Sequence, residues 1–198
     1  MGVGRGGTAP LPCGVYLDGV GGDDLVVGSF DGQVTALDGT GTVLWARNYT
    51  YCITSIEPCQ LYAPTPTDNL LVTERGYLHY LNASGEEYWN LFPEGVTGTA
   101  TGDLDGDQQA DLLVGLNNEQ GTAHGLVYVY YGTNAALDPA NATVDASIAD
   151  ARLIQLEAVG YFGEGLETGD FNGDGYDDIF ISSVAPDPSL TVVFGAPR

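Results

Sequence analysis

Two short acidic stretches hold the residues with the clearest chemistry in this 198-residue chain, DLDGDQQAD at 103–111 and DFNGDGYDD at 170–178. Each stretch places an oxygen-bearing side chain at loop positions 1, 3, 5 and 9, and position 7 can add a backbone carbonyl. Such alternation in a tight loop turns several oxygens toward one point. The candidate metal ligands are Asp103, Asp105, Asp107, Gln109 and Asp111 in the first stretch and Asp170, Asn172, Asp174, Tyr176 and Asp178 in the second.

The chemistry of these ligands favours calcium. Hard oxygen ligands, high negative charge and flexible geometry suit Ca²⁺ better than Mg²⁺, which keeps more waters and demands a stricter octahedron. Neither stretch contains Cys or His, and this argues against zinc or copper. We therefore expect two Ca²⁺ sites. A third stretch keeps Asp18 and Asp24 but has Tyr16 and Val20 at positions 1 and 5, so its oxygen set is incomplete.

Two other interpretations of the acidic stretches are open. They can be solvated turns, because Asp, Asn and Gly are ordinary turn residues. They can also be EF-hand loops, but an EF-hand needs a bidentate Glu at position 12 and a helix on each side. Val114 and Ile181 stand at position 12, inside short apolar runs rich in β-forming residues. The sequence therefore predicts loops that lead into strands.

The elements that must position these loops recur along the chain. One unit consists of an acidic loop, a D-L-[LV]-V-G strand, a Gly-rich turn and an alternating strand, without a convincing helix. Regularly spaced short strands indicate an all-β fold, and a repeat of roughly 40–65 residues points to propeller blades. We expect one β-propeller-like domain over residues 1–198, partial or of about four blades of short antiparallel sheets. Its units run approximately over 14–50, 51–97, 98–158 and 159–198.

The composition limits the partners. The chain has 27 acidic and 5 basic residues, a net charge of −22, which excludes a nucleic-acid surface and argues against binding to anionic membranes. No apolar stretch approaches the ~20 residues of a membrane span, and no signal peptide is visible. We nevertheless expect an extracellular or cell-surface location, because calcium loops of this kind usually need extracellular calcium levels. The sequons at Asn48, Asn82 and Asn141 support secretion weakly.

The chain has three cysteines, which do not indicate a disulfide framework. Cys52 and Cys59 are close enough in sequence to clip one loop, and Cys13 is left over.

The fourth unit resembles the FG-GAP (VCBS-type) repeats that form the blades of the integrin α-subunit head. Phe162-Gly163 followed by Thr168–Ile179 is similar to the FG…GD-NGDGYDDL core of that family, and 184–186 falls where its GAP element belongs. The third unit matches as well, with Gln108 in place of the usual Gly. The first two units also resemble quinoprotein-type propeller repeats, as at 28–38.

The resemblance implies a propeller whose calcium loops lie on one face and stiffen it, while the opposite face and the rim bind partners. The family usually closes with seven or so blades, so the chain is expected to be a fragment or a partial propeller with exposed edge strands. The implied function is a non-enzymatic module for protein or glycan recognition, for example in cell adhesion, with structural Ca²⁺.

Two alternatives remain. The chain can be the propeller domain or subdomain of a secreted polysaccharide lyase or a quinone-dependent dehydrogenase, yet His79 and His124 look like surface or packing residues, and no G-x-S-x-G element is present. Trp45 and Trp89 recur in equivalent strands, which favours blade packing over a cofactor site. A lectin would need exposed aromatic residues such as those at 128 and 130, but burial of that strand face is the simpler account.

Overall fold

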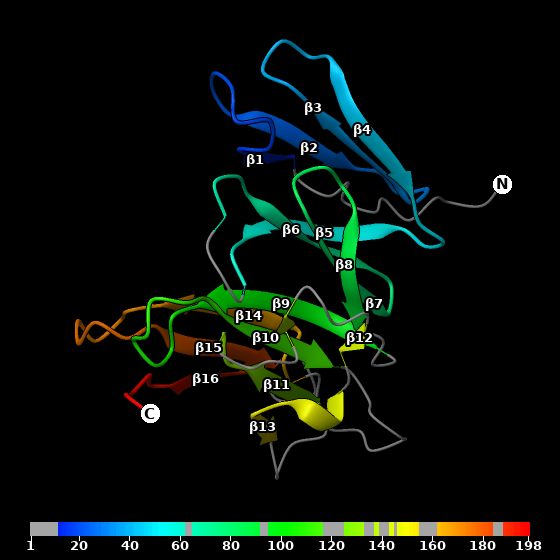
Figure 1. Ribbon diagram of the computed structural model, residues 1–198. Helices are drawn as coiled ribbons and strands as arrows, with labels where there is room; N and C mark the ends of the chain where they lie inside the picture. The colour runs from blue at the N-terminus through cyan, green and yellow to red at the C-terminus, as the bar shows by residue number, and fades with distance from the viewer. Residues whose placement is uncertain are drawn as a thin grey trace, which may run out of the picture.

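The computed structural model of the protein describes residues 12–61, 65–91, 95–116, 125–132, 137–138, 143–144, 146–154, 162–183 and 188–198. These residues form strands, one short 3-10 turn and no α-helix. The strands make four sheets that follow one another in chain order (Figure 1). His124, Asn141 and 184–186 lie outside the described residues.

Each sheet is built from consecutive strands. Sheet 1 contains β1 (Cys13–Val15), β2 (Asp24–Gly28), β3 (Gln33–Leu37) and β4 (Val43–Asn48). Sheet 2 contains β5 (Ile53–Cys59), β6 (Asn69–Glu74), β7 (Tyr77–Leu81) and β8 (Glu87–Leu91), with β12 (Thr143–Val144) added to β8 in parallel. Sheet 3 contains β9 (Val96–Gly102), β10 (Asp111–Leu116), β11 (Leu126–Tyr130) and β13 (Ala151–Ile154), which follows the 3-10 turn η3 (Ala146–Ile148). Sheet 4 contains β14 (Gly165–Gly169), β15 (Asp178–Ser183) and β16 (Ser189–Val193).

The sheets pack face to face through three apolar cores, because successive strand residues point to opposite faces. In β6, Leu70 packs into the core shared with sheet 1, and Leu71 packs into the core shared with sheet 3. In β10, Leu112 faces sheet 2 and Leu113 faces sheet 4. The middle sheets are therefore apolar on both faces, which explains why their strands are nearly continuous apolar runs.

The aromatic residues singled out in the sequence pack between sheets. Trp89 is fully buried, and its indole N–H donates to the carbonyl of Leu137 at 3.1 Å. Trp45 is partly buried against the core of sheets 1 and 2. Tyr128 and Tyr130 lie in the core of sheets 2 and 3, so they are not the exposed aromatic residues that a lectin site would need.

The three cysteines are free. Strand β5 begins directly after Cys52 and ends at Cys59, and seven extended steps of about 3.3 Å separate the two residues by about 23 Å. The two residues therefore do not clip a loop.

The Phe162-Gly163 pair fixes how sheet 4 meets sheet 3. A Cβ atom on Gly115 in β10 would lie 2.0 Å from the carbonyl oxygen of Gly163, and one on Gly125 would lie 2.0 Å from that of Phe162. Gly163 has a positive φ of 90°, which L side chains rarely adopt. Glycine is required here because the backbone of the turn lies directly on the backbone of sheet 3.

Replacing Gly115 by Ala should therefore destabilise the protein. An added Cβ cannot fit 2.0 Å from a backbone oxygen, so sheets 3 and 4 must shift. We expect the free energy of unfolding to fall by about 1–3 kcal/mol or more, measured by urea denaturation. Gly14→Ala in β1 is the control, because a Cβ there has no neighbour within 4 Å. Equal urea midpoints for the two variants would contradict this packing.

Candidate functional site

The first acidic loop winds around the carboxylate of Asp103, the first residue of the connection from β9 to β10. One oxygen of this carboxylate accepts a hydrogen bond from the backbone N–H of Gly106 at 2.8 Å, and the other accepts from that of Gln108 at 2.9 Å. Asp105 accepts from the N–H of Asp107 at 3.2 Å. These bonds are possible because short Asp side chains reach backbone groups two to five residues ahead.

The second acidic loop repeats this pattern. Asp170 accepts from the N–H groups of Gly173 at 2.7 Å, Asp174 at 3.0 Å and Gly175 at 2.9 Å. Asn172 accepts from the N–H of Asp174 at 2.8 Å, as Asp105 does from Asp107 in the first loop. The same spacing therefore folds into the same loop at both places.

Position 9 of each loop is a buried carboxylate at the first residue of the second strand. Asp111 is fully buried, and it accepts from the N–H of Leu104 at 2.8 Å and from that of Gly132 at 2.7 Å. Burial raises the pKa of Asp111 to about 7, against the effect of these two hydrogen bonds. Asp178 is equally buried and accepts from the N–H groups of Phe171 and Gly195, each at 3.0 Å.

The first loop brings three carboxylates together. Asp103, Asp105 and Asp111 each offer an oxygen, and the three oxygens lie within 4.8 Å of one another. The side chain of Asp105 is only 7% exposed, and burial raises its pKa. The guanidinium of Arg198 lies beside this cluster, with its Nη1 atom 3.8 Å from Asp105. A single half-exposed arginine leaves most of this negative charge uncompensated.

The remaining predicted ligands lie in the same loops but outside this cluster. Asp107 accepts from the N–H of Gln109 at 2.8 Å, and Asp174 accepts from that of Tyr176 at 3.0 Å, so both cap their own loops. In the second loop Asn172 stands where the first has Asp105, and an amide replaces the third carboxylate. The carboxylates of Asp170, Asp174 and Asp178 do not form a comparable cluster among the described residues.

The stretch at 16–24 has a related conformation with fewer oxygens. The carboxylate of Asp24 accepts from the N–H groups of Leu17 at 2.8 Å and Asp18 at 3.1 Å. Its other oxygen is buried without a hydrogen-bond partner. Asp18 accepts from the N–H of Val20 at 2.7 Å. The buried carboxylate of the repeat is thus retained here, but the cluster around it is not.

Two aspartates join consecutive sheets at these loops. Asp177 accepts from the N–H of Asp103 at 2.9 Å and donates its own N–H to the Asp103 carbonyl at 2.9 Å. Asp68 makes the same pair of bonds with Tyr16, at 2.8 Å and 2.7 Å. This role was not predicted for either residue, although both directly precede the first residue of a second strand and so share a sequence signal.

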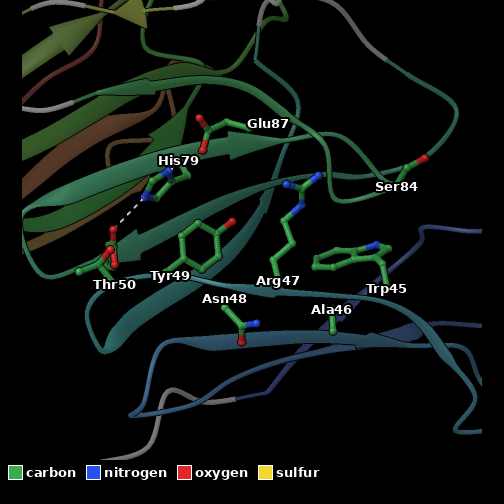
Figure 2. A pocket seen from close by; sticks show the side chains of 10 residues that line it. Trp45, Ala46, Arg47, Asn48, Tyr49, Thr50, His79, Ser84 and Glu87 are labelled. Atoms are coloured by element: carbon green, nitrogen blue, oxygen red, sulfur yellow. Dashed lines mark hydrogen bonds and ion pairs between the residues drawn. The ribbon is translucent and has the colours of Figure 1, made fainter.

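A polar cleft of about 540 Å³ lies between sheets 1 and 2. Figure 2 shows Trp45, Arg47 and Tyr49 on the side of β4 and the following turn, with His79 and Glu87 on sheet 2. The Nδ1 atom of His79 lies 2.7 Å from Glu87, and its Nε2 atom lies 3.3 Å from Glu74. Carboxylates thus engage both ring nitrogens of a histidine that is 8% exposed.

Tyr49 completes the wall of the cleft. Its ring centroid lies 4.7 Å from that of His79, and its hydroxyl is buried without a hydrogen-bond partner. Burial raises the pKa of Tyr49 to about 12, and the nearby charge of Glu87 adds to this effect. His79 and Trp45 were singled out from the sequence, but the cleft could not be predicted, because the residues that line it come from two different sheets.

In the part of the chain that the structure describes, no helix has the length and apolar character of a membrane span.

Comparison with known proteins identifies the fourth unit. Residues 162–183 match the family model described as FG-GAP repeat, which confirms the resemblance at the segment that carries Phe162-Gly163 and the second acidic loop. A search of curated proteins finds no match.

Two solved structures have a similar fold. The first is the crystal structure of BBS1N in complex with ARL6DN, soaked with lead, with a TM-score of 0.56, 12% identity, and coverage of 93% of this chain and 55% of that chain. The second is the C-terminal WD40 domain of Sif2, with a TM-score of 0.54, 14% identity, and coverage of 87% and 43%. Both are β-propeller proteins, and the predicted all-β propeller architecture is confirmed. This chain spans about half the length of the structures it matches.

Replacing Gln108 by Gly should stabilise the first loop. Gln108 has a φ of +69°, and among the described residues it is the only non-glycine with a positive φ, whereas the equivalent Gly175 has +92°. This conformation strains an L side chain by roughly 1–2 kcal/mol, partly offset by the greater freedom of Gly in the unfolded chain. We expect a net gain of up to about 1 kcal/mol in urea denaturation.

Gln109→Gly is the matched control, because Gln109 lies next to Gln108 in the loop but has no positive φ, so the same change should lower the stability. Equal losses in both variants would show that Gln108 carries no strain.

Proposed function

We propose that this chain is a calcium-stabilised β-propeller module that recognises a protein or glycan outside the cell, for example in adhesion. The observation that carries the calcium is the cluster of Asp103, Asp105 and Asp111, whose oxygens lie within 4.8 Å of one another. Two of these side chains are largely buried, and the pKa values of both are raised. A divalent cation with oxygen ligands would compensate the charge that Arg198 leaves.

The proposed role of the ion is structural. A Ca²⁺ that binds only the folded loop stabilises it by about 2.7 kcal/mol at a concentration 100 times its dissociation constant. The first loop would use its three clustered carboxylates with Asp107 and the carbonyl of Gln109. The second loop would use Asp170, Asn172, Asp174, the carbonyl of Tyr176 and Asp178. Its amide at position 3 lowers the ligand charge, so we expect weaker binding there.

The polar cleft between sheets 1 and 2 is the proposed recognition site. Its volume of about 540 Å³ lies within the 300–1,000 Å³ typical of ligand sites. Its walls combine aromatic rings with the polar groups of Arg47 and Asn48, a combination that suits a sugar ring or a polar peptide side chain.

Binding is favoured over catalysis by the state of His79. A general base needs a free nitrogen within reach of its substrate, but both ring nitrogens of His79 face carboxylates. This weakens the alternative of a lyase or quinone-dependent dehydrogenase. The extracellular location is supported by the FG-GAP repeat at 162–183, a repeat typical of extracellular proteins, and by the millimolar calcium found there.

Calcium should raise the thermal stability of the EDTA-treated protein. A gain of about 2.7 kcal/mol corresponds to a melting temperature roughly 5–10 °C higher for a chain of this size. Asp105→Asn and Asp174→Ala should each lose part of this rise, because each removes an oxygen ligand or its charge. Asp38→Asn should keep the full rise, since Asp38 caps a turn outside both loops through Thr40 and Thr42. A melt that responds to neither Ca²⁺ nor EDTA would end the calcium proposal.

Recognition should depend on the cleft. Glycan arrays and peptide display should yield ligands whose affinity falls at least tenfold in Arg47→Ala, because this side chain lines the cleft. Arg75→Ala, in an exposed turn of sheet 2 outside the cleft, should bind normally. Lyase and dye-reduction assays should show no turnover, whereas calcium-dependent turnover would favour the enzymatic alternative.

A further inference from the structure

The packing of the four sheets follows one register. In the second strand of each sheet, the third residue faces the next sheet along the chain. Val26, Leu71 and Leu113 occupy this place in sheets 1, 2 and 3, and each is fully buried. Phe180 occupies it in sheet 4 and is only partly buried. The outward face of sheet 4 thus has the pattern of an inter-sheet surface.

The third strands show the same difference. Leu190 in β16 pairs with Ser182, the fifth residue of β15. By the same register its equivalents are Val34, Leu78 and Val127, all 0% exposed, whereas Leu190 is 63% exposed. Val192 is likewise 38% exposed. The physical reason is plain: the first three residues have a following sheet against them, and Leu190 has none among the described residues.

The exposed residues form one apolar surface. The ring of Phe171 lies 3.8 Å, between centroids, from that of Phe180. These two rings line a hollow of about 310 Å³ with Leu166 and Leu190. We call Phe171, Phe180, Leu190 and Val192 the outer face of sheet 4. An exposed apolar surface of this kind marks an interaction site in a soluble protein.

Sheet 1 presents the complementary half of the same interface. The second residue of each second strand faces the preceding sheet. Leu70, Leu112 and Ile179 hold this place in sheets 2, 3 and 4, and all three are buried. Leu25 is the equivalent residue in sheet 1, and it is 37% exposed. Val43 on β4, the edge strand of the same sheet, is 56% exposed. One chain therefore carries both halves of an inter-sheet contact that it uses three times internally.

We propose that a second copy of this chain completes the interface, with sheet 4 of each copy packed on sheet 1 of the other. The contact would continue the register of the three internal interfaces. Two copies would bring eight sheets together, within the four to eight blades of closed propellers, and each chain matches about half of the propeller structures compared with it. Two such contacts related by a twofold axis close a ring.

The charge of the protein sets the conditions for this association. Each copy carries a net charge of −22, so two copies repel at low salt. Moderate salt screens this repulsion over a Debye length of about 8 Å at physiological ionic strength, and bound cations reduce it further. The dimer is expected to strengthen with salt, as an apolar contact between like-charged partners should.

The test is the mass of the intact chain by sedimentation equilibrium and light scattering at physiological salt with Ca²⁺. The expected mass is twice the 20.7 kDa of one chain. Leu190→Glu blocks the outer face of sheet 4 and Leu25→Glu blocks that of sheet 1, so each variant alone should be monomeric. Ile154→Glu is the control, because Ile154 is 40% exposed on the edge strand β13 of sheet 3 and should leave the dimer intact.

Mixing the two blocked variants gives the distinguishing result. Leu190→Glu retains an intact sheet 1, and Leu25→Glu retains an intact sheet 4, so an equimolar mixture should form a one-to-one dimer. Circular dichroism checks that each variant is folded, and the wild-type mass tests the proposal without any variant. The proposal is overturned if the wild type stays monomeric to about 100 µM, which is far above the dissociation constant expected of a specific interface. It is also overturned if Leu25→Glu alone remains dimeric or if the wild-type mass grows beyond two copies.

Discussion

The buried aspartate that begins the second strand is the constraint on which each acidic loop depends. In Asp111 one carboxylate oxygen accepts from the backbone of loop position 2, and the other accepts from the glycine that follows the third strand. Asp178 does the same. One side chain thus joins a loop and two strands in a buried place where no water can replace it. The other loop oxygens gather around it, so the candidate metal site is a consequence of how the blade is held together.

The loops also determine how the four sheets are placed beside one another. Backbone bonds at loop position 1 set each sheet beside the next, and alternation along the strands gives each middle sheet two apolar faces. The polar cleft lies between the β4 side of sheet 1 and sheet 2, and two carboxylates hold His79 there. The fold, the acidic loops and the cleft therefore all follow from the repeated unit.

Much of this was predictable from the sequence because the repeat encodes it locally. The D-L-[LV]-V-G pattern marks the second strands correctly, and the spacing of Asp103, Asp105 and Asp111 predicts their convergence. The spacing could not show that Asp107 also caps the loop backbone through the N–H of Gln109, since that depends on φ and ψ. The roles of Asp68 and Asp177 were missed because they depend on contacts 52 and 74 residues apart in sequence. The cleft was missed because its residues come from two sheets. The possible clip between Cys52 and Cys59 is absent because a strand, which spacing alone does not reveal, runs between them.

The contact between sheets 2 and 3 shows what aligns the sheets. There Leu61 and Ala110 pair through a parallel bridge at the place where Tyr16 meets Asp68 and Asp103 meets Asp177. Neither residue is acidic, yet the sheets still meet in the same way. Main-chain groups, which every amino acid possesses, therefore carry the alignment. A sheet can therefore lack the acidic side chains of its loop and still align with its neighbour, which is compatible with four units so unequal in sequence within a single architecture.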